Sequence, residues 1–473
     1  MRAVKWTAAV LAGLGIAAIA VFCAVFGPTH RPDAPAGRSY AWSEADGVAR
    51  CGPAELRVVR GIAVMHLRGD PYDLGYENGR LTRDRVGAIE RHLLGEFARI
   101  VPNPAARALL FAMGVIKYRT IFARIPPDLR MEFRGSADGC GNPTWYLGDY
   151  YRRIVFYHAF HDLTQTFGKS PLLACTGLAA GGPATLGGRL VVGRNFDFEG
   201  GRIFDEGKVL IVFHPSEGHA FASVGWGGMA SVVTGVNDAR LFVAILAGAS
   251  RETAAEGIPV NLLVREMLQR CGSIGDVLAM AKTNPVMVPN LYLVADGKTG
   301  LAGVLELTAR TVAFRPMTGG LLAVTNHYLT KPLAQDPENL ALESRITTRE
   351  RYARLEELLL VRAGLIDPAA AIAMLRDRNL AGGGDLPLGD RRAINALNTT
   401  HSVAADLTAG LFYVSRGPNV VGEYVGFDLA RLFDAGANRF DDAVAGEVPA
   451  DPVVGTQAYR RFLASGDPRA YRF

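Results

Sequence analysis

An uncharged apolar run at positions 7–26 opens the chain, and Arg2 and Lys5 precede it. A helix of about 20 apolar residues is long enough to span a bilayer. Because the run ends in Phe, Gly and Pro without a small-residue cleavage site, we expect residues 1–28 to be an uncleaved membrane anchor. The basic flank then makes the chain a single-pass protein of the cell membrane, with its remainder outside the cytoplasm. The alternative is a cleaved signal, which would leave a secreted or periplasmic protein.

Two blocks with different patterns follow a linker, rich in Pro, Ala and Gly, at residues 29–50. In residues 51–174, apolar side chains recur mainly at helical spacing, which predicts a mostly helical block behind an opening strand. From residue 175 to 473, short β-rich runs such as RLVVGRNFDF, KVLIVFH and LYLVAD are separated by Gly, Asn and Asp, which predicts stacked sheets. Helical stretches at 258–282 and 342–376 suit helices on the outer faces of antiparallel sheets, an α+β fold.

Composition limits the classes of protein that the chain can be. With 473 residues, of which 49% are hydrophobic and 21% charged, it is too apolar to be disordered and long enough to bury a large core. Its net charge of +5 is spread along the chain, whereas a nucleic-acid-binding protein needs a basic patch. Five cysteines without CxxC or a Cys/His cluster exclude a disulfide scaffold and structural zinc of the usual spacing. Cys51 and Cys140 either pair in an oxidising compartment or stay free.

The stretch 172–200 carries the candidate chemistry. Cys175 lies at the junction of the two blocks, and Arg194 and Asp197 follow it. A thiol becomes a strong nucleophile when a base or a positive neighbour favours its thiolate. A peptide break just before Cys175 would supply the base, since a free α-amino group has a pKa of roughly 8. The alternative is that Cys175 is a small core residue, as free cysteines usually are.

Arg194 and Asp197 are three residues apart in a predicted strand. Residues three apart in a regular strand face opposite sides of the sheet. If both side chains serve one site, a β-bulge or a strand end near Asp197 must therefore re-aim one of them.

The motifs CTG, which begins at Cys175, and GRNFDF resemble those of the choloylglycine hydrolase and acyl-CoA:6-aminopenicillanic acid acyltransferase group of N-terminal nucleophile (Ntn) hydrolases. In that group the cysteine follows an autoproteolytic cut. Phe198 stands where the family motif has Trp. The upstream run LRGDPYDLGYENG resembles the start of acyltransferase-type prosequences, which favours that branch.

The resemblance covers about residues 58–430 and implies roles further along the chain. TGVNDARLFVA resembles the family segment whose asparagine lies at the oxyanion hole, and here that residue is Asn237. LLAVTN resembles the strand that ends in a second oxyanion asparagine, Asn326. SRITTRERYARL resembles the helix with a buried arginine, Arg351. The structural alternatives are a hairpin turn for Asn237 and a solvated helix charge for Arg351.

The resemblance implies a four-layer αββα sandwich of antiparallel sheets, the Ntn-hydrolase fold. Residues 51–174 would be a prosegment that becomes a light chain, and residues 175–473 the heavy chain. The cut would fall between Ala174 and Cys175. The implied catalytic residues are Cys175, Arg194, Asp197, Asn237, Asn326 and Arg351.

The reaction implied by the resemblance is attack by the cysteine on the linear amide bond of a small N-acyl substrate, through a thioester. It needs no metal or organic cofactor. Hydrolysis and acyl transfer both stay open, as does assembly into a homo-oligomer. The alternative from another class is a membrane-tethered binding protein with an inactive Ntn-like fold, whose chain would stay uncut.

Overall fold

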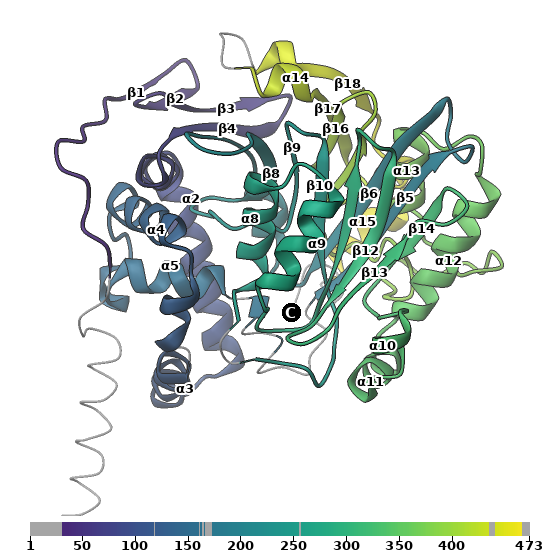
Figure 1. Cartoon of the computed structure of the whole chain (residues 1–473), viewed down its shortest axis with the longest axis horizontal. Coiled ribbons are helices and arrows are strands. Elements are labelled where there is room, and N and C mark those ends of the chain that lie inside the picture. Colours follow the sequence, from purple (N-terminus) through teal and green to yellow (C-terminus); the bar gives the residue numbers. More distant parts are fainter. Residues whose placement is uncertain are drawn as a thin grey trace, which may run out of the picture.

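The computed structural model of the chain describes residues 31–465, apart from 118, 160, 163–164, 166–172, 255–256 and 435–439. Two stacked sheets form its centre, and helices cover their outer faces (Figure 1). None of the helices within these ranges has both the length and the apolar character of a membrane span. The expected anchor at 7–26 lies outside the described residues and stays a prediction.

The larger sheet, as far as the structure describes it, has eleven strands in the order β1-β2-β3-β4-β7-β8-β9-β10-β11-β12-β13. Their bounds are β1 (Trp42–Ala45), β2 (Val48–Cys51), β3 (Ala54–Val59), β4 (Ile62–Gly69), β7 (Lys208–Pro215), β8 (Phe221–Trp226), β9 (Thr234–Asn237), β10 (Leu241–Ala247), β11 (Asn290–Asp296), β12 (Leu301–Leu307) and β13 (Val312–Pro316). Helices α8 (Val260–Arg270) and α9 (Ile274–Thr283) pack on its outer face. Strand β11 is buried at every position, because both faces of the sheet are covered.

The smaller sheet has the strand order β14-β5-β6-β15-β16-β17-β18, and each neighbouring pair is antiparallel. Its strands are β14 (Leu321–Val324), β5 (Leu173–Gly182), β6 (Gly188–Phe198), β15 (Thr399–Asp406), β16 (Leu411–Gly417), β17 (Glu423–Asp428) and β18 (Val444–Val448). Helices α12 (Thr348–Val361) and α13 (Pro368–Leu375) cover its outer face, and β5 packs on β10, β11 and β12 of the larger sheet. The layers therefore follow the expected order of helix, sheet, sheet and helix.

Residues 51–174 form a helical side of the molecule and also extend the larger sheet (Figure 1). Their α-helices are α2 (Pro71–Ile100), α3 (Pro104–Lys117), α4 (Pro127–Cys140) and α5 (Tyr150–His158). Strand β4 pairs with β7 in parallel, so this block continues the sheet of the second block. Cys51 and Cys140 are buried free thiols.

The segment 29–50 differs from the linker predicted for it. Strand β1 and most of β2 lie within it and pair with each other. The Arg80 guanidinium of α2 lies 4.4 Å from the centre of the Trp42 ring, a cation–π contact that helps to hold β1 in place. Strands this short give too few alternating positions to stand out in a sequence rich in Pro, Ala and Gly.

Shorter elements complete the described chain. The α-helices are α7 (Arg202–Glu206), α10 (Lys331–Ala334), α11 (Pro337–Arg345), α14 (Leu429–Leu432) and α15 (Gln457–Ala464). The 3-10 helices are η1 (Arg119–Arg124), η2 (Trp145–Leu147), η3 (Asp441–Ala443) and η4 (Pro452–Gly455).

Helices α2 and α4 cross in close contact through glycines spaced four residues apart. Gly75 and Gly79 lie in α2, and Gly135 and Gly139 lie in α4. A Cβ added at any of the four would come within 2.3 Å of a backbone carbonyl oxygen of the other helix. Small residues at this spacing allow two helix backbones to approach closely. The glycines of LGYENG therefore have a packing function.

We expect Gly75→Ala to destabilise the protein, because its methyl group would lie 1.8 Å from the carbonyl oxygen of Glu132. Overpacking of this kind typically costs about 1–3 kcal/mol. The matched control is Gly95→Ala in the same helix, where an added Cβ has no atom within 4 Å and alanine favours the helix. The midpoint of urea unfolding should fall for the first variant only. Equal midpoints would show that α2 and α4 separate without cost.

Candidate active site

Cys175 lies near the start of β5, between the two sheets. It pairs with Phe196 of β6, and its side chain is 1% exposed. Gly177, which points to the same side of β5, faces Leu293 of the larger sheet. The thiol of Cys175 is therefore directed into the space between the sheets.

Arg194 of β6 holds its guanidinium against this thiol. Its Nη2 donates to Cys175 Sγ at 3.4 Å and also to the carbonyl oxygen of Ile245. Its Nη1 donates to Thr234 Oγ1 and to His401 Nε2. Apart from the thiol, these acceptors are neutral, so the charge of Arg194 is not cancelled by a bonded carboxylate.

Arg351 of α12 is buried and binds the backbone at Cys175, instead of being the solvated helix charge that was the alternative. Its Nη1 donates to the carbonyl oxygen of Cys175 at 2.6 Å and to Thr176 Oγ1 at 2.8 Å. Its Nη2 donates to Asn326 Oδ1 at 2.9 Å. Arg351 therefore connects β5 with Asn326, two residues beyond the end of β14.

Asn326 contacts the peptide bond at which the sequence predicts a cut. Its Oδ1 accepts the backbone N–H of Cys175 at 2.8 Å. Its Nδ2 donates one hydrogen to the carbonyl oxygen of Ala247 at 2.9 Å. An amide nitrogen carries two hydrogens, so Nδ2 can donate one more hydrogen bond.

Asp197 is opposite Ala174 in the β5–β6 ladder. Thr399 of β15 donates to its Oδ1 at 2.7 Å. The β5–β6 register is regular on both sides of Asp197, from Leu173 to Ala180 of β5, so the bulge expected to re-aim Arg194 or Asp197 is not found there. A register shift lies instead on the neighbouring strand β15, between Thr399 and His401, and sets Thr399 opposite Asp197 and His401 opposite Phe196. The carboxylate thus lies at the end of the ladder, beside the predicted cut.

Burial dominates the ionisation of the site. It raises the pKa of Cys175 above its ordinary value, and the charges of Arg194 and Arg351 oppose this effect, whereas Asp197 adds to it. Burial likewise raises the pKa of Asp197, and Arg351 is the largest opposing influence. The two arginines therefore provide the electrostatic support that a buried thiolate needs.

The hydrogen bonds that the structure gives Asn237 do not go to this cluster. Its Nδ2 donates to the carbonyl oxygens of Leu268 and Cys271, and its Oδ1 accepts the N–H of Leu241. These bonds fasten the β9–β10 hairpin to the C-terminus of α8, so Asn237 has the turn function that was its structural alternative. Thr234, three residues earlier in β9, is the residue of this segment that contacts Arg194.

Thr234, Thr399 and His401 all contact site residues, but no sequence pattern indicated a role for them. The two residues from β15 belong to the run NTTHSV. Every residue of β15 is buried. Polar side chains concentrated in a strand between apolar runs were the signal that could have indicated them, because buried polar groups need partners.

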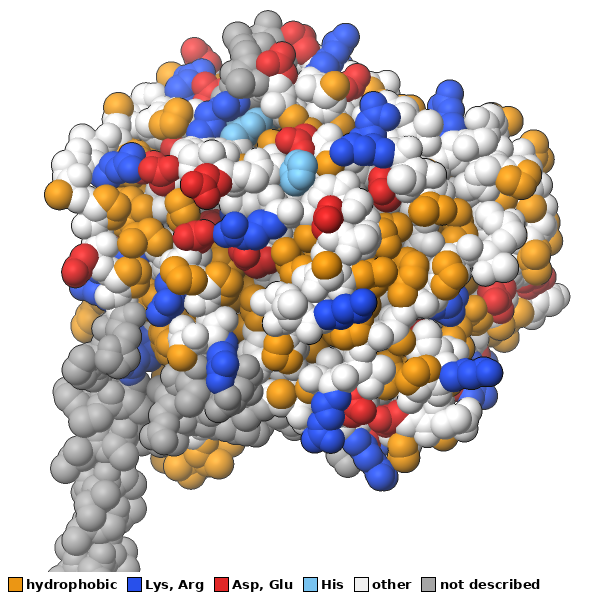
Figure 2. Space-filling view, viewed as in Figure 1, with side chains coloured by type: hydrophobic (Ala, Val, Ile, Leu, Met, Phe, Trp, Pro, Cys, Tyr) orange, Lys and Arg blue, Asp and Glu red, His pale blue; other side chains and the backbone are white. Residues whose placement is uncertain are grey.

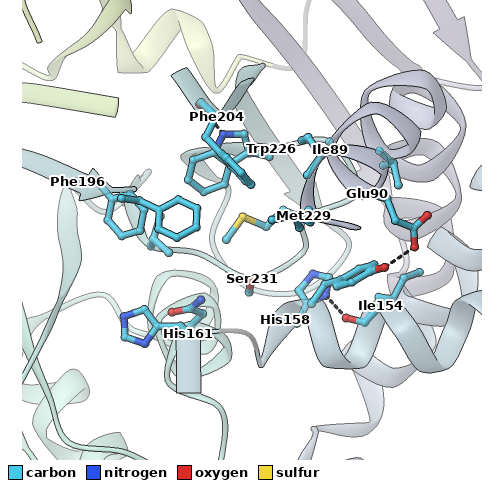
Figure 3. Close-up of a pocket in the computed structure, with 18 of the residues that line it drawn as sticks. Ile89, Glu90, Ile154, His158, His161, Phe196, Phe204, Trp226, Met229 and Ser231 are labelled. Carbon is cyan, nitrogen blue, oxygen red and sulfur yellow. Dashed lines mark hydrogen bonds between the residues drawn. The ribbon is translucent and has the colours of Figure 1, made fainter. Parts of the chain in front are cut away.

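An apolar cavity of about 160 Å³ lies between the helices of the first block and the sheets. Figure 3 shows Phe196, Trp226 and Met229 facing Ile154 and His158 across it. Phe196 connects the cavity with the site, because it pairs with Cys175 and its ring centre lies 4.5 Å from the Arg194 guanidinium. The cavity can therefore hold an apolar group beside Phe196, whereas Cys175 itself does not line it.

Glu90 contributes a carboxylate to the cavity wall, but that charge is compensated. Arg153 donates to it at 2.7 Å, and Tyr157 and Thr144 also donate to it. Among the described residues no group of three or more His, Cys, Asp or Glu could hold a metal ion.

The chain matches the family model of acyl-coenzyme A:6-aminopenicillanic acid acyl-transferase over residues 185–381. An uncharacterized protein of Archaeoglobus fulgidus is 28% identical over 352 residues, which cover 65% of this chain and 56% of that protein. Protein dcd1B of Dictyostelium discoideum is 23% identical over 294 residues, which cover 57% of this chain and 56% of that protein. The chain thus spans little more than half the length of these relatives.

Two solved structures also match. A variant of conjugated bile acid hydrolase from Clostridium perfringens is 16% identical, covers 54% of this chain and 93% of its own, and has a TM-score of 0.38. Penicillin V acylase from Agrobacterium tumefaciens is 13% identical, covers 59% of this chain and 99% of its own, and has a TM-score of 0.37. The match at 185–381 confirms the resemblance inferred from the motifs: this part of the chain is similar to the acyl-coenzyme A:6-aminopenicillanic acid acyl-transferase family.

Proposed function

We propose that the protein is an Ntn-type cysteine amidase or acyltransferase that acts on linear N-acyl amide bonds after cutting its own chain before Cys175. The observation that carries this proposal is the set of contacts on one residue. The thiol, N–H and carbonyl of Cys175 are each held by a different buried side chain: Arg194, Asn326 and Arg351.

Self-cleavage starts with attack of Cys175 Sγ on the carbonyl carbon of Ala174. A C–S bond forms, the Ala174–Cys175 C–N bond breaks, and the thiol proton passes to the new α-amine. Water then hydrolyses the thioester, which leaves a carboxylate on Ala174 and restores the thiol. Asn326 already accepts the N–H of this peptide bond, and Asp197 lies opposite Ala174, where a carboxylate can hold the new ammonium.

The same groups act in the turnover of substrate by the cut enzyme. The α-amine of Cys175 takes the thiol proton, the thiolate attacks the substrate carbonyl, and the amine returns the proton to the leaving nitrogen. Water or a second amine then resolves the thioester. The second hydrogen of Asn326 Nδ2 stabilises the oxyanion, a contribution that is typically worth a factor of about 10² to 10³ in rate.

The cavity favours a substrate with an apolar group beside the scissile amide. Its wall is mainly aromatic and aliphatic, and the Glu90 charge in it is paired. We expect no nucleic-acid partner, since acidic and basic side chains are interspersed on the face shown in Figure 2. The substrate class is therefore a small N-acyl compound.

We also propose that residues 7–26 attach the protein to the outer face of the cell membrane. The apolar length of this run and the basic residues before it support the proposal. Helix α3 adds support, because Leu109, Leu110, Phe111 and Met113 are each at least 39% exposed. An exposed apolar helix of this kind is typical of contact with a membrane surface.

The first test is cleavage. We expect the wild-type chain to run as two fragments on a denaturing gel, one of which begins with Cys175. Cys175→Ala should stay in one piece and folded, and the control Cys271→Ala, which alters another buried cysteine, should still be cut. An active, uncut wild-type chain would refute the Ntn mechanism. An inactive, uncut one would favour the binding protein.

The second test separates two asparagines with different surroundings. In chains that are already cut, Asn326→Ala should lower kcat for an N-acyl substrate found by screening by about 10²-fold or more, because an oxyanion donor acts in the transition state. The matched control Asn237→Ala loses three hydrogen bonds at the β9–β10 turn and should lower stability, but not kcat. Wild-type kcat in folded Asn326→Ala would assign the oxyanion site to another residue.

The third test concerns location. Native protein should remain in the membrane fraction after a high-salt wash and be released by detergent, because residues 7–26 contain no charge that salt could screen. Sequencing of its N-terminus provides the control. Soluble protein that begins beyond residue 28 would mean that the run is a cleaved signal.

A further inference from the structure

His401 is a fully buried histidine that the proposed mechanism does not use. It belongs to β15 and lies opposite Phe196 of β6. Its ring stacks on Phe196 with a centre distance of 5.1 Å and an interplanar angle of 17°, and it lies 5.9 Å from the Trp226 ring. The plane of the imidazole is therefore fixed by packing.

The polar contacts of His401 define its protonation. Its Nε2 lies 3.1 Å from Arg194 Nη1 and 3.0 Å from Thr234 Oγ1. A guanidinium only donates hydrogen bonds, so Nε2 must accept and the ring proton must be on Nδ1. Burial, followed by the charges of Arg194 and Lys208, holds the pKa of His401 well below its ordinary value. The imidazole is thus a neutral acceptor.

We propose that His401 is a positioning residue, whose neutral Nε2 holds the Arg194 guanidinium so that Nη2 reaches the thiol of Cys175. The role of this contact in catalysis rests on the proposed function. The guanidinium is a rigid planar fork, so fixing Nη1 by His401 and Thr234 also fixes the direction of Nη2. Nη2 is then left for Ile245 and Cys175.

A neutral acceptor suits this position better than a carboxylate would. A carboxylate bonded to Arg194 would oppose the positive charge that favours the thiolate. An imidazole without a proton on Nε2 accepts the same hydrogen bond, and because it is neutral it does not oppose the positive charge of Arg194. His401 therefore combines orientation of the arginine with preservation of its electrostatic effect on Cys175.

The competing explanation is that His401 only fills space between Phe196 and Trp226. His401→Leu keeps an apolar side chain but removes the acceptor, whereas His401→Gln supplies a carbonyl oxygen in its place. Packing alone predicts that both variants behave alike. If His401 positions Arg194, His401→Gln should keep the reactivity of the Cys175 thiol that His401→Leu loses.

The experiment measures the pH dependence of Cys175 alkylation by iodoacetamide in the full chain, read by peptide mass spectrometry. Peptides that span 174–175 or begin at Cys175 distinguish uncut from cut chains, and each is compared with wild type in the same state. The charged groups that face the thiol, Arg194, Asp197 and Arg351, stay in place in both His401 variants. The self-cleavage rate is recorded alongside.

His401→Leu should raise the pH of half-maximal alkylation by about one unit, at the lower end of the effect of an opposite charge on a neighbouring pKa. It should also slow self-cleavage, and His401→Gln should return both values toward wild type. Adding His401→Leu to Arg194→Gln should cause no further shift, since one residue acts through the other.

Two results would overturn the proposal: a wild-type alkylation profile in His401→Leu, or equal defects in the Leu and Gln variants. If His401→Leu does not fold, Thr234→Val tests the same arrangement, because it removes the other acceptor of Nη1 and should shift the profile in the same direction. A shifted profile in a chain that never cuts itself would support the positioning and refute the Ntn mechanism.

Discussion

Two buried guanidinium groups, one on each side of Cys175, set the main constraint on this structure. Arg194 is 0% exposed and Arg351 is 1% exposed. A buried charge is costly unless its donors are bonded. The acceptors come from β5, β9, β10 and β15 and from Asn326, two residues beyond β14. Both sheets and α12 must therefore be in place before these charges are stable, so the site forms only with the whole fold.

The first block, residues 51–174, is an integral part of this fold. Strand β4 lies between β3 and β7, so the larger sheet is continuous across the block boundary. Glu132 of α4 and Arg265 of α8 form a buried ion pair at 3.1 Å. Residues of α2 and α5 also line the apolar cavity next to Phe196. The helical block thus contributes to the sheet, the core and the surroundings of the thiol.

The features that could be predicted from the sequence are the strands and site motifs that depend on local pattern. Fully buried strands are continuous apolar runs, and each motif around Cys175, Arg194, Asn326 and Arg351 is a short unbroken stretch of sequence. The parts that could not be predicted depend on tertiary pairing. Whether Asn237 or Thr234 faces the site depends on the face that β9 turns toward β6, and a short segment reveals neither its partner nor its register.

The parallel pairing of β4 with β7 has a consequence for the proposed cut. A break before Cys175 would sever the connection between the blocks, but it would leave the β4–β7 ladder, the α4–α8 ion pair and the shared core untouched. The two products could separate only by exposing an unpaired edge of β7 and the apolar surface beneath it, which amounts to unfolding. They would therefore migrate as one particle under native conditions, and the maturation of this protein would change its covalent structure without changing its size in solution.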